Sequence, residues 1–238
     1  MSHQPSLSPD TLYRLLSRRD LTDPLQGPHA MQALAAAIHE AVGSLGYPVR
    51  YTRLQAVRPP RDGEPPVPQL ACGPIDQLEQ AALPRSAGEQ SPVMLGALGA
   101  VHGLDLAGGV RLHGHQLSLW LSDGAAGQDP LPAILTLALS AAVPGLSYRL
   151  LPTEDPRLDR VFAVQLRHDD DWVAVGLCGR VAHARLGPMQ GLILELDELL
   201  ALRKGLPDKG LIYSTRAEDR SRMLDLEPWA EASVSRTG

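Results

Sequence analysis

Three closely spaced histidines are the first residues in the chain that could bind a metal. His102, His113 and His115 lie within 14 positions. His113 and His115, two positions apart, would face the same side of a β-strand, where two imidazoles can share a zinc ion. No cysteine accompanies them. We therefore expect a partly exposed strand or loop here, and no metal.

A cysteine and a histidine five positions apart could support nucleophilic chemistry. Cys178 and His183 would supply a thiol and a base. The only other cysteine is Cys72, and this wide separation fits neither a zinc finger nor a disulfide scaffold. The pair is a hypothesis for a reactive thiol, and its alternative is a buried thiol without chemistry.

Two acidic segments could hold cations or could form turns. Residues 169–171 are three consecutive aspartates, which are explained without a ligand as solvated carboxylates in a hairpin turn. Asp20, Thr22 and Asp23 precede Pro24, and we expect them to cap a helix or form a turn. The chain contains no G-x-G-x-x-G, Walker, H-E-x-x-H or G-x-S-x-G motif, which argues against the common nucleotide-binding folds and hydrolases.

Composition places the chain among globular proteins. It has 238 residues, of which 44% are apolar and 21% charged, and its net charge is -5. The basic residues are 20 arginines and 2 lysines, but no segment is basic enough for an autonomous nucleic-acid binder. No apolar run approaches the roughly 18 residues of a membrane span, and the first ten residues lack a secretory signal. We expect a cytoplasmic protein without a membrane partner.

Hydrophobic periodicity predicts helices mixed with strands. Residues 29–45 carry an apolar stripe at three-, four- and seven-residue spacing, which predicts a helix, and residues 130–143 predict a buried one. We expect short helices at 74–83 and 215–224, and residues 190–202 to begin as a strand and end as a helix. The predicted strands are residues 49–57, 93–101, 116–122, 146–151, 160–167 and 172–178.

This order of elements predicts an α+β fold with a mostly antiparallel sheet flanked by helices. Residues 59–92 hold eight prolines, which we interpret as a surface excursion and not as a linker between domains. The whole chain, residues 1–238, is therefore expected to form a single domain.

Four patches of sequence share motifs with one family. They are residues 19–29 with the helix and strand that follow to Pro59, residues 101–120, residues 172–179, and residues 191–205 with 212–214 and 223–229. Together they resemble the catalytic core of class II aminoacyl-tRNA synthetases, specifically the phenylalanyl-tRNA synthetase-like branch. The resemblance implies a class II core and a homodimer formed through residues 29–59. It also places Cys178 where the family has a structural cysteine, which favours the buried thiol.

The residues that would perform the family's reaction are replaced. That reaction needs arginines to hold the ATP phosphates, and carboxylates to hold magnesium and the substrate ammonium. The arginine pair of the second motif aligns with Gly103 and Leu104, and only Asp105 of that motif is kept. In the third motif Glu195 stands for a glycine and Glu198 for the key arginine, and the strand glutamates align with Ala174 and Leu177.

These losses favour a catalytically degenerate paralogue, with no catalytic residues, metal or cofactor, that acts as a ligand-binding, regulatory or accessory protein. Its ligand would be an amino acid or another small molecule, and a protein or tRNA partner is a further expectation. The alternative is an active ligase that uses ATP and magnesium to activate an amino acid or other carboxylate, with replacement cations from Arg111, Arg180 or Arg185. The resemblance implies a former substrate pocket lined by Arg111, His115, Gln116, Trp120, Trp172, Gly179 and Glu198.

Overall fold

The computed structural model describes residues 19–58, 69–70, 74–81, 92–104, 110–122, 129–155, 158–183 and 186–229, with positions 8, 10, 11, 13 and 17. Within these residues no helix is both long enough and apolar enough to cross a membrane.

One sheet of seven strands organises the described chain. Its strand order is β1-β4-β5-β9-β8-β7-β6; β1 and β4 are parallel, and every other neighbouring pair is antiparallel. The strands are β1 (Val49–Arg53), β4 (Met94–Leu104), β5 (Val110–Ser122), β6 (Tyr148–Pro152), β7 (Asp159–His168), β8 (Asp171–His183) and β9 (Gly187–Glu195). Two short strands, β2 (Val57–Arg58) and β3 (Gln69–Leu70), pair separately.

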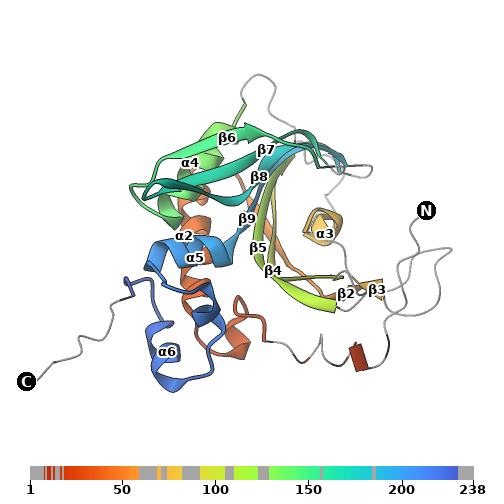
Figure 1. The fold of residues 1–238 in the computed structure, drawn as a ribbon. Coiled ribbons are helices and arrows are strands. Elements are labelled where there is room, and N and C mark those ends of the chain that lie inside the picture. The colour runs from red at the N-terminus through yellow and green to blue at the C-terminus, as the bar shows by residue number, and fades with distance from the viewer. Residues whose placement is uncertain are drawn as a thin grey trace, which may run out of the picture.

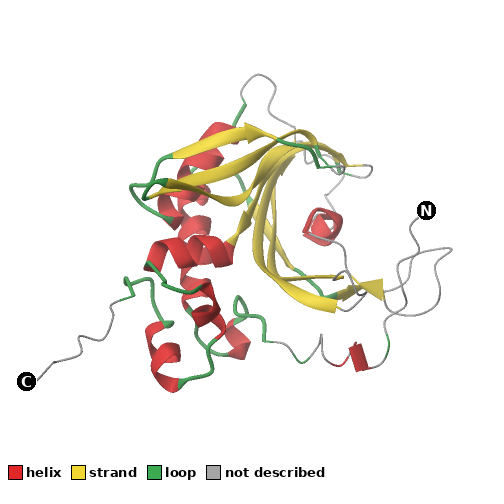
Figure 2. Cartoon of the chain, viewed as in Figure 1, coloured by secondary structure: helices red, strands yellow, loops and turns green. Residues whose placement is uncertain are grey.

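Helices cover both faces of the curved sheet unequally. Against its convex face lie α2 (Ala30–Gly43), α4 (Leu131–Ala142) and α5 (Leu196–Lys204), whereas α3 (Pro74–Ala81) lies in the hollow of the concave face (Figure 1). The separation of the helices into these two layers is clear in Figure 2. The remaining helical segments are η1 (Pro24–Gln26), η2 (Lys209–Tyr213) and α6 (Ala217–Arg222).

Strand alternation divides the apolar residues between two cores. On the convex side the leucines at 117, 119 and 121 of β5 pack with β9 and with the buried stripe of α2. On the concave side Trp120 packs with Met189 and Ile193 of β9 and with Ile75 and Leu78 of α3. The sheet is therefore buried on both faces at its centre, and α3 closes the concave side.

The α+β fold with a mostly antiparallel sheet is confirmed, and most predicted elements occur near their predicted positions. The helix predicted at 29–45 is Ala30–Gly43, and residues 190–202 do begin as a strand and end as a helix, at β9 and α5. The strands predicted at 116–122 and 172–178 are longer, at Val110–Ser122 and Asp171–His183. Within residues 59–92, α3 is the helix predicted at 74–83, and most of the segment lies outside the described residues.

A buried lysine fixes the C-terminal segment to the end of α5. The Lys204 side chain is 1% exposed, and its ammonium donates to the backbone oxygens of Asp225 and Glu227 and to the Asp225 carboxylate at 3.3 Å. The Lys204 backbone oxygen in turn accepts from the Trp229 N–H at 2.6 Å. A cation at a helix C-terminus also interacts favourably with the helix dipole. Lys204 therefore positions residues 206–229, which form part of the site described below.

Replacing this ammonium by an apolar group of similar length should loosen the segment. We expect Lys204→Met to lose about 2 kcal/mol of unfolding free energy, because the charged hydrogen bonds from the buried ammonium to two backbone oxygens are lost. Urea unfolding monitored by tryptophan fluorescence measures the change. Arg203→Met, the neighbouring substitution, should stay within about 0.5 kcal/mol of the native protein. Equal stability of the two variants would contradict this role for Lys204.

Candidate functional site

A cluster of polar groups joins three elements on the convex side of the sheet. Asp197, in the first turn of α5, accepts hydrogen bonds from the backbone N–H of His115 in β5 and from the hydroxyl of Tyr213 at the end of η2. The two Asp197 carboxylate oxygens also lie 3.4 and 3.5 Å from His115 Nδ1. We call these three residues the Asp197 cluster.

The N-terminal segment fixes the protonation of His115. The Leu21 N–H donates to His115 Nε2 at 3.1 Å, so this nitrogen carries the lone pair. The proton of the neutral ring is then on Nδ1, facing the Asp197 carboxylate. His115 is fully buried, and both of its ring nitrogens are engaged in contacts within the protein. Its contacts fasten Leu21 to the sheet.

The environment keeps Asp197 ionised and Tyr213 protonated. Burial by itself would raise the pKa of Asp197, but the hydrogen bonds from the His115 side chain and backbone and from the Tyr213 hydroxyl outweigh burial and hold this pKa below its ordinary value. Burial and the adjacent carboxylate raise the pKa of Tyr213. The cluster thus holds one negative charge with its donors arranged around it, as in a structural polar network.

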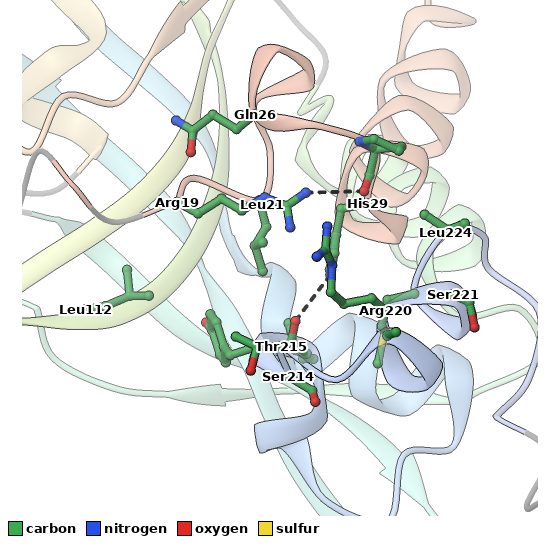
Figure 3. Close-up of a pocket in the computed structure, with 15 residues that line it drawn as sticks. Arg19, Leu21, Gln26, His29, Leu112, Ser214, Thr215, Arg220, Ser221 and Leu224 are labelled. Atoms are coloured by element: carbon green, nitrogen blue, oxygen red, sulfur yellow. Dashed lines mark hydrogen bonds between the residues drawn. The ribbon is translucent and has the colours of Figure 1, made fainter.

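Beside the cluster is a cavity of about 810 Å³, between the N-terminal segment and the residues that follow α5 (Figure 3). We call it the Arg19 cavity. Its wall is mainly apolar, with two arginines and several hydroxyl groups. It is lined by Arg19, Leu21, Gln26, Pro28, His29, Leu112, Ile212, Tyr213, Ser214, Thr215, Ala217, Arg220, Ser221, Met223 and Leu224.

Arg19 has few hydrogen bonds for a guanidinium group. One terminal nitrogen donates to the Pro28 carbonyl oxygen at 3.4 Å (Figure 3). Its Nε is buried and has no hydrogen-bond acceptor in the described part of the chain. Since buried polar groups are nearly always satisfied, this nitrogen calls for an acceptor that the described residues do not supply.

His29 borders the same cavity as a neutral side chain. It is the N-cap of α2, where its Nδ1 accepts from the Met31 N–H at 3.1 Å, and its Nε2 lies 3.3 Å from the Ile212 carbonyl oxygen. The ring proton is therefore on Nε2. Burial, helped by the charge of Arg19, outweighs the hydrogen bond to Ile212 and lowers the pKa of His29 to about 4. At neutral pH the arginines carry the charge of this wall.

A smaller acidic pocket adjoins the Arg19 cavity, with which it shares Leu112 and Tyr213. Its volume is about 310 Å³, and its polar lining is His113, Glu195, Asp197, Glu198 and Lys209. Glu198 pairs with Lys209, while Glu195 accepts from the Gln116 amide at 2.6 Å. Burial raises the pKa of Glu195, and the negative charges of Asp197 and Glu198 raise it as well. The hydrogen bond from Gln116 acts in the opposite direction, but the net shift is upward.

The seven residues expected to line one substrate pocket do not share one location. His115 lies within the convex side, whereas the neighbouring Gln116 and Trp120 face the concave side. Gly179 is opposite Gly191 in the centre of the sheet, next to Trp120. Trp172 is seven positions away along β8, about 23 Å at the usual rise, and stacks against Arg149. Glu198 borders the acidic pocket, and the Arg111 side chain lies outside the described residues.

The other candidate residues take structural positions. His102 and His115 are buried but His113 is exposed, and no group of three metal-ligating side chains occurs in the described part of the chain. Cys178 is buried, which raises the pKa of its thiol to about 11 and fits the unreactive alternative; the His183 side chain lies outside the described residues. Asp169 is in the turn between β7 and β8, as predicted.

Asp20 and Asp23 confirm the prediction of caps and turns. Asp20 accepts from the backbone and the hydroxyl of Thr22, at 2.9 and 2.7 Å, and Asp23 caps η1 by accepting from the Leu25 N–H. Both carboxylates also lie near Arg53, at 4.0 and 3.1 Å. This turn holds the segment from which Leu21 reaches His115.

Comparison of the chain with protein-family models and with curated proteins gives no match.

Sequence reasoning did not single out Asp197, Tyr213, Arg19 or His29 as a group. They come from four segments that the chain brings together only on folding, with hydrogen bonds that join residues 82 to 183 positions apart, such as His115 with Asp197 and His29 with Ile212. The N-cap role of His29 carried no local signal, because the side chains usually found at this position are those of serine, threonine, aspartate and asparagine.

Removing the charge of Asp197 should destabilise the fold strongly. We expect Asp197→Asn to lose about 3 kcal/mol of unfolding free energy, because the amide nitrogen would face donors that the carboxylate now satisfies. Glu198→Gln is the matched control on the same helix turn; it breaks an exposed pair with Lys209 and should cost about 0.5 kcal/mol. Chemical denaturation compares them, and similar losses would refute the structural role of Asp197.

His29 should make stability depend on pH. Its folded pKa of about 4 lies below the usual 6.5, so between these values the unfolded chain binds the additional proton. The contribution of His29 to the unfolding free energy is fully present above pH 6.5. It falls by up to about 1.4 kcal/mol per pH unit as the pH is lowered to about 4. We expect His29→Asn, which keeps a capping oxygen, to reduce the difference in unfolding free energy between pH 7 and 4.5 by about 2 kcal/mol. An unaltered slope in His29→Asn would be the contrary result.

Proposed function

We propose that this chain is a catalytically degenerate relative of the class II aminoacyl-tRNA synthetase core that acts by binding and not by aminoacylation. The observation that carries the proposal is the filling of the concave face. The convex face is covered by α2, α4 and α5, so ATP lying over the sheet would need the concave face. There Ile75 and Leu78 of α3, 3% and 0% exposed, pack on Trp120.

The side chains at the positions that the resemblance assigns to the reaction support the same conclusion. Ala174 and Leu177 stand at the strand positions that the resemblance assigns to carboxylates, so magnesium and a substrate ammonium would lack ligands. Glu198, at the position assigned to a nucleotide-binding arginine, repels phosphate, and its pairing with Lys209 explains how the fold tolerates the charge. The mostly antiparallel sheet, with β9 leading directly into α5, supports the relationship.

The unit proposed for self-association is residues 29–59. In the described part of this unit, α2 is followed along the chain by β1, which is an edge strand of the sheet. A second copy could extend the sheet at β1 or pack on this edge. Sedimentation equilibrium of the whole chain tests the proposed homodimer, and a monomer at all concentrations would remove it.

The absence of catalysis can be tested directly. We expect no ATP–pyrophosphate exchange above background with any standard amino acid, and no thermal stabilisation by ATP with magnesium. Glu198→Arg should not create exchange, because the second-motif arginines and the strand glutamates are missing too. An active class II synthetase assayed in parallel is the control. Amino-acid-dependent exchange that falls in Arg111→Ala would establish the alternative, an ATP-dependent ligase.

A further inference from the structure

We propose that the Arg19 cavity binds a small organic monocarboxylate with an apolar body and no ammonium group. This assignment rests on the proposed binding function and gives it a ligand class. The cavity lies on the convex side among the N-terminal segment, η2 and α6, away from the concave face that a synthetase core would use for ATP.

The need for an anion comes from Arg19. Its guanidinium has one long hydrogen bond, to Pro28, and a buried Nε without an acceptor among the described residues. The guanidinium lines the cavity with its terminal N–H groups largely unused, and a carboxylate supplies both acceptor oxygens for them and the opposite charge. An anionic ligand therefore accounts for an arginine that the described chain leaves incompletely bonded.

A second cation and the absence of carboxylates strengthen the argument. Arg220 of α6 lines the same cavity, and no aspartate or glutamate is among the lining residues. The nearest acids on α6 have other partners: Asp219 accepts from the Ser214 hydroxyl, and Glu218 pairs with Arg222. Since His29 is neutral above about pH 4, the wall presents two positive charges and no described negative one.

The rest of the wall selects an apolar body. Leu21, Ile212 and Met223 are at most 4% exposed, and they line the cavity together with Leu112. A volume of about 810 Å³ is in the range of small-molecule sites. An apolar wall with a few convergent charges is the usual form of such a site, so inorganic anions would leave most of this surface unused.

The same geometry disfavours a free amino acid. An ammonium in this cavity would lie near two guanidinium groups without a described carboxylate in the lining. Two carboxylates outside the lining are already engaged: Asp20, between the lining residues Arg19 and Leu21, accepts from Thr22, and Asp197 of the acidic pocket accepts from His115 and Tyr213. We therefore expect the cavity to bind carboxylates that lack an ammonium group in preference to free amino acids.

The experiment uses the full chain, with 3-phenylpropionate as the probe and methyl NMR as the readout. Addition of the probe should shift the methyl signals of Leu21 and Ile212, and the neutral 3-phenylpropanamide and the zwitterion phenylalanine should bind about tenfold more weakly or not at all. Raising NaCl from about 0.05 M to about 0.5 M should weaken the binding of 3-phenylpropionate, because the charges are partly open to solvent.

Substitutions locate the charge recognition. Arg220→Gln changes an exposed residue and should fold normally, yet we expect it to weaken 3-phenylpropionate binding about fivefold or more, and Arg19→Gln about tenfold or more. Arg167→Gln, an exposed arginine of β7 on the other face, is the matched control and should bind as the native chain does. Equal binding of the amide and the acid, or native affinity in Arg220→Gln, would overturn the proposal.

Failure of this proposal is distinct from failure of the proposed function. If the chain neither binds 3-phenylpropionate nor catalyses ATP–pyrophosphate exchange, the proposed ligand class is refuted. The proposal of a non-catalytic synthetase relative then still stands. Exchange activity would overturn the non-catalytic function, whatever the cavity binds.

Discussion

The buried charge of Asp197 is the constraint on which the arrangement of the convex side depends. A carboxylate away from water has to be surrounded by donors, and here these come from β5, through the His115 backbone, and from η2, through Tyr213. The second ring nitrogen of His115, Nε2, then needs a donor, and the Leu21 N–H supplies it. One desolvated charge thereby fixes the relative positions of the sheet, α5, η2 and the N-terminal segment.

The Arg19 cavity is a consequence of this arrangement. Leu21 is held by His115, and Tyr213 by Asp197, so the two segments that carry Arg19 and residues 214–224 are fastened on either side of an apolar space. His29 joins them again through Ile212, while Lys204 anchors the chain beyond α6 to the end of α5. The cavity walls are thus tied down by hydrogen bonds of the lining residues and of their neighbours, a preorganised state in which a ligand would order few additional groups.

The two faces of the sheet have different roles in this reading. The concave face, covered by α3 over Trp120, contributes to the stability of the core. The convex side combines a core with the polar connections and the cavity. Under the proposed function, ligands would be recognised away from the covered part of the concave face, and the residues that line the Arg19 cavity supply the charged and hydroxyl groups for that.

The sequence by itself determined the elements of this protein, because apolar periodicity is a local property. The stripe of α2, the alternation at Leu117, Leu119 and Leu121, and the strand-to-helix change near residue 195 all follow from neighbours within a few positions. It also placed the turn at Asp20 and the buried Cys178. Only the tertiary structure decided that His115 and Gln116 serve opposite faces, and that the candidate pocket residues are dispersed. Burial, hydrogen-bond satisfaction and the shape of a cavity depend on groups about two hundred positions apart, such as Arg19 and Arg220, which no local pattern brings together.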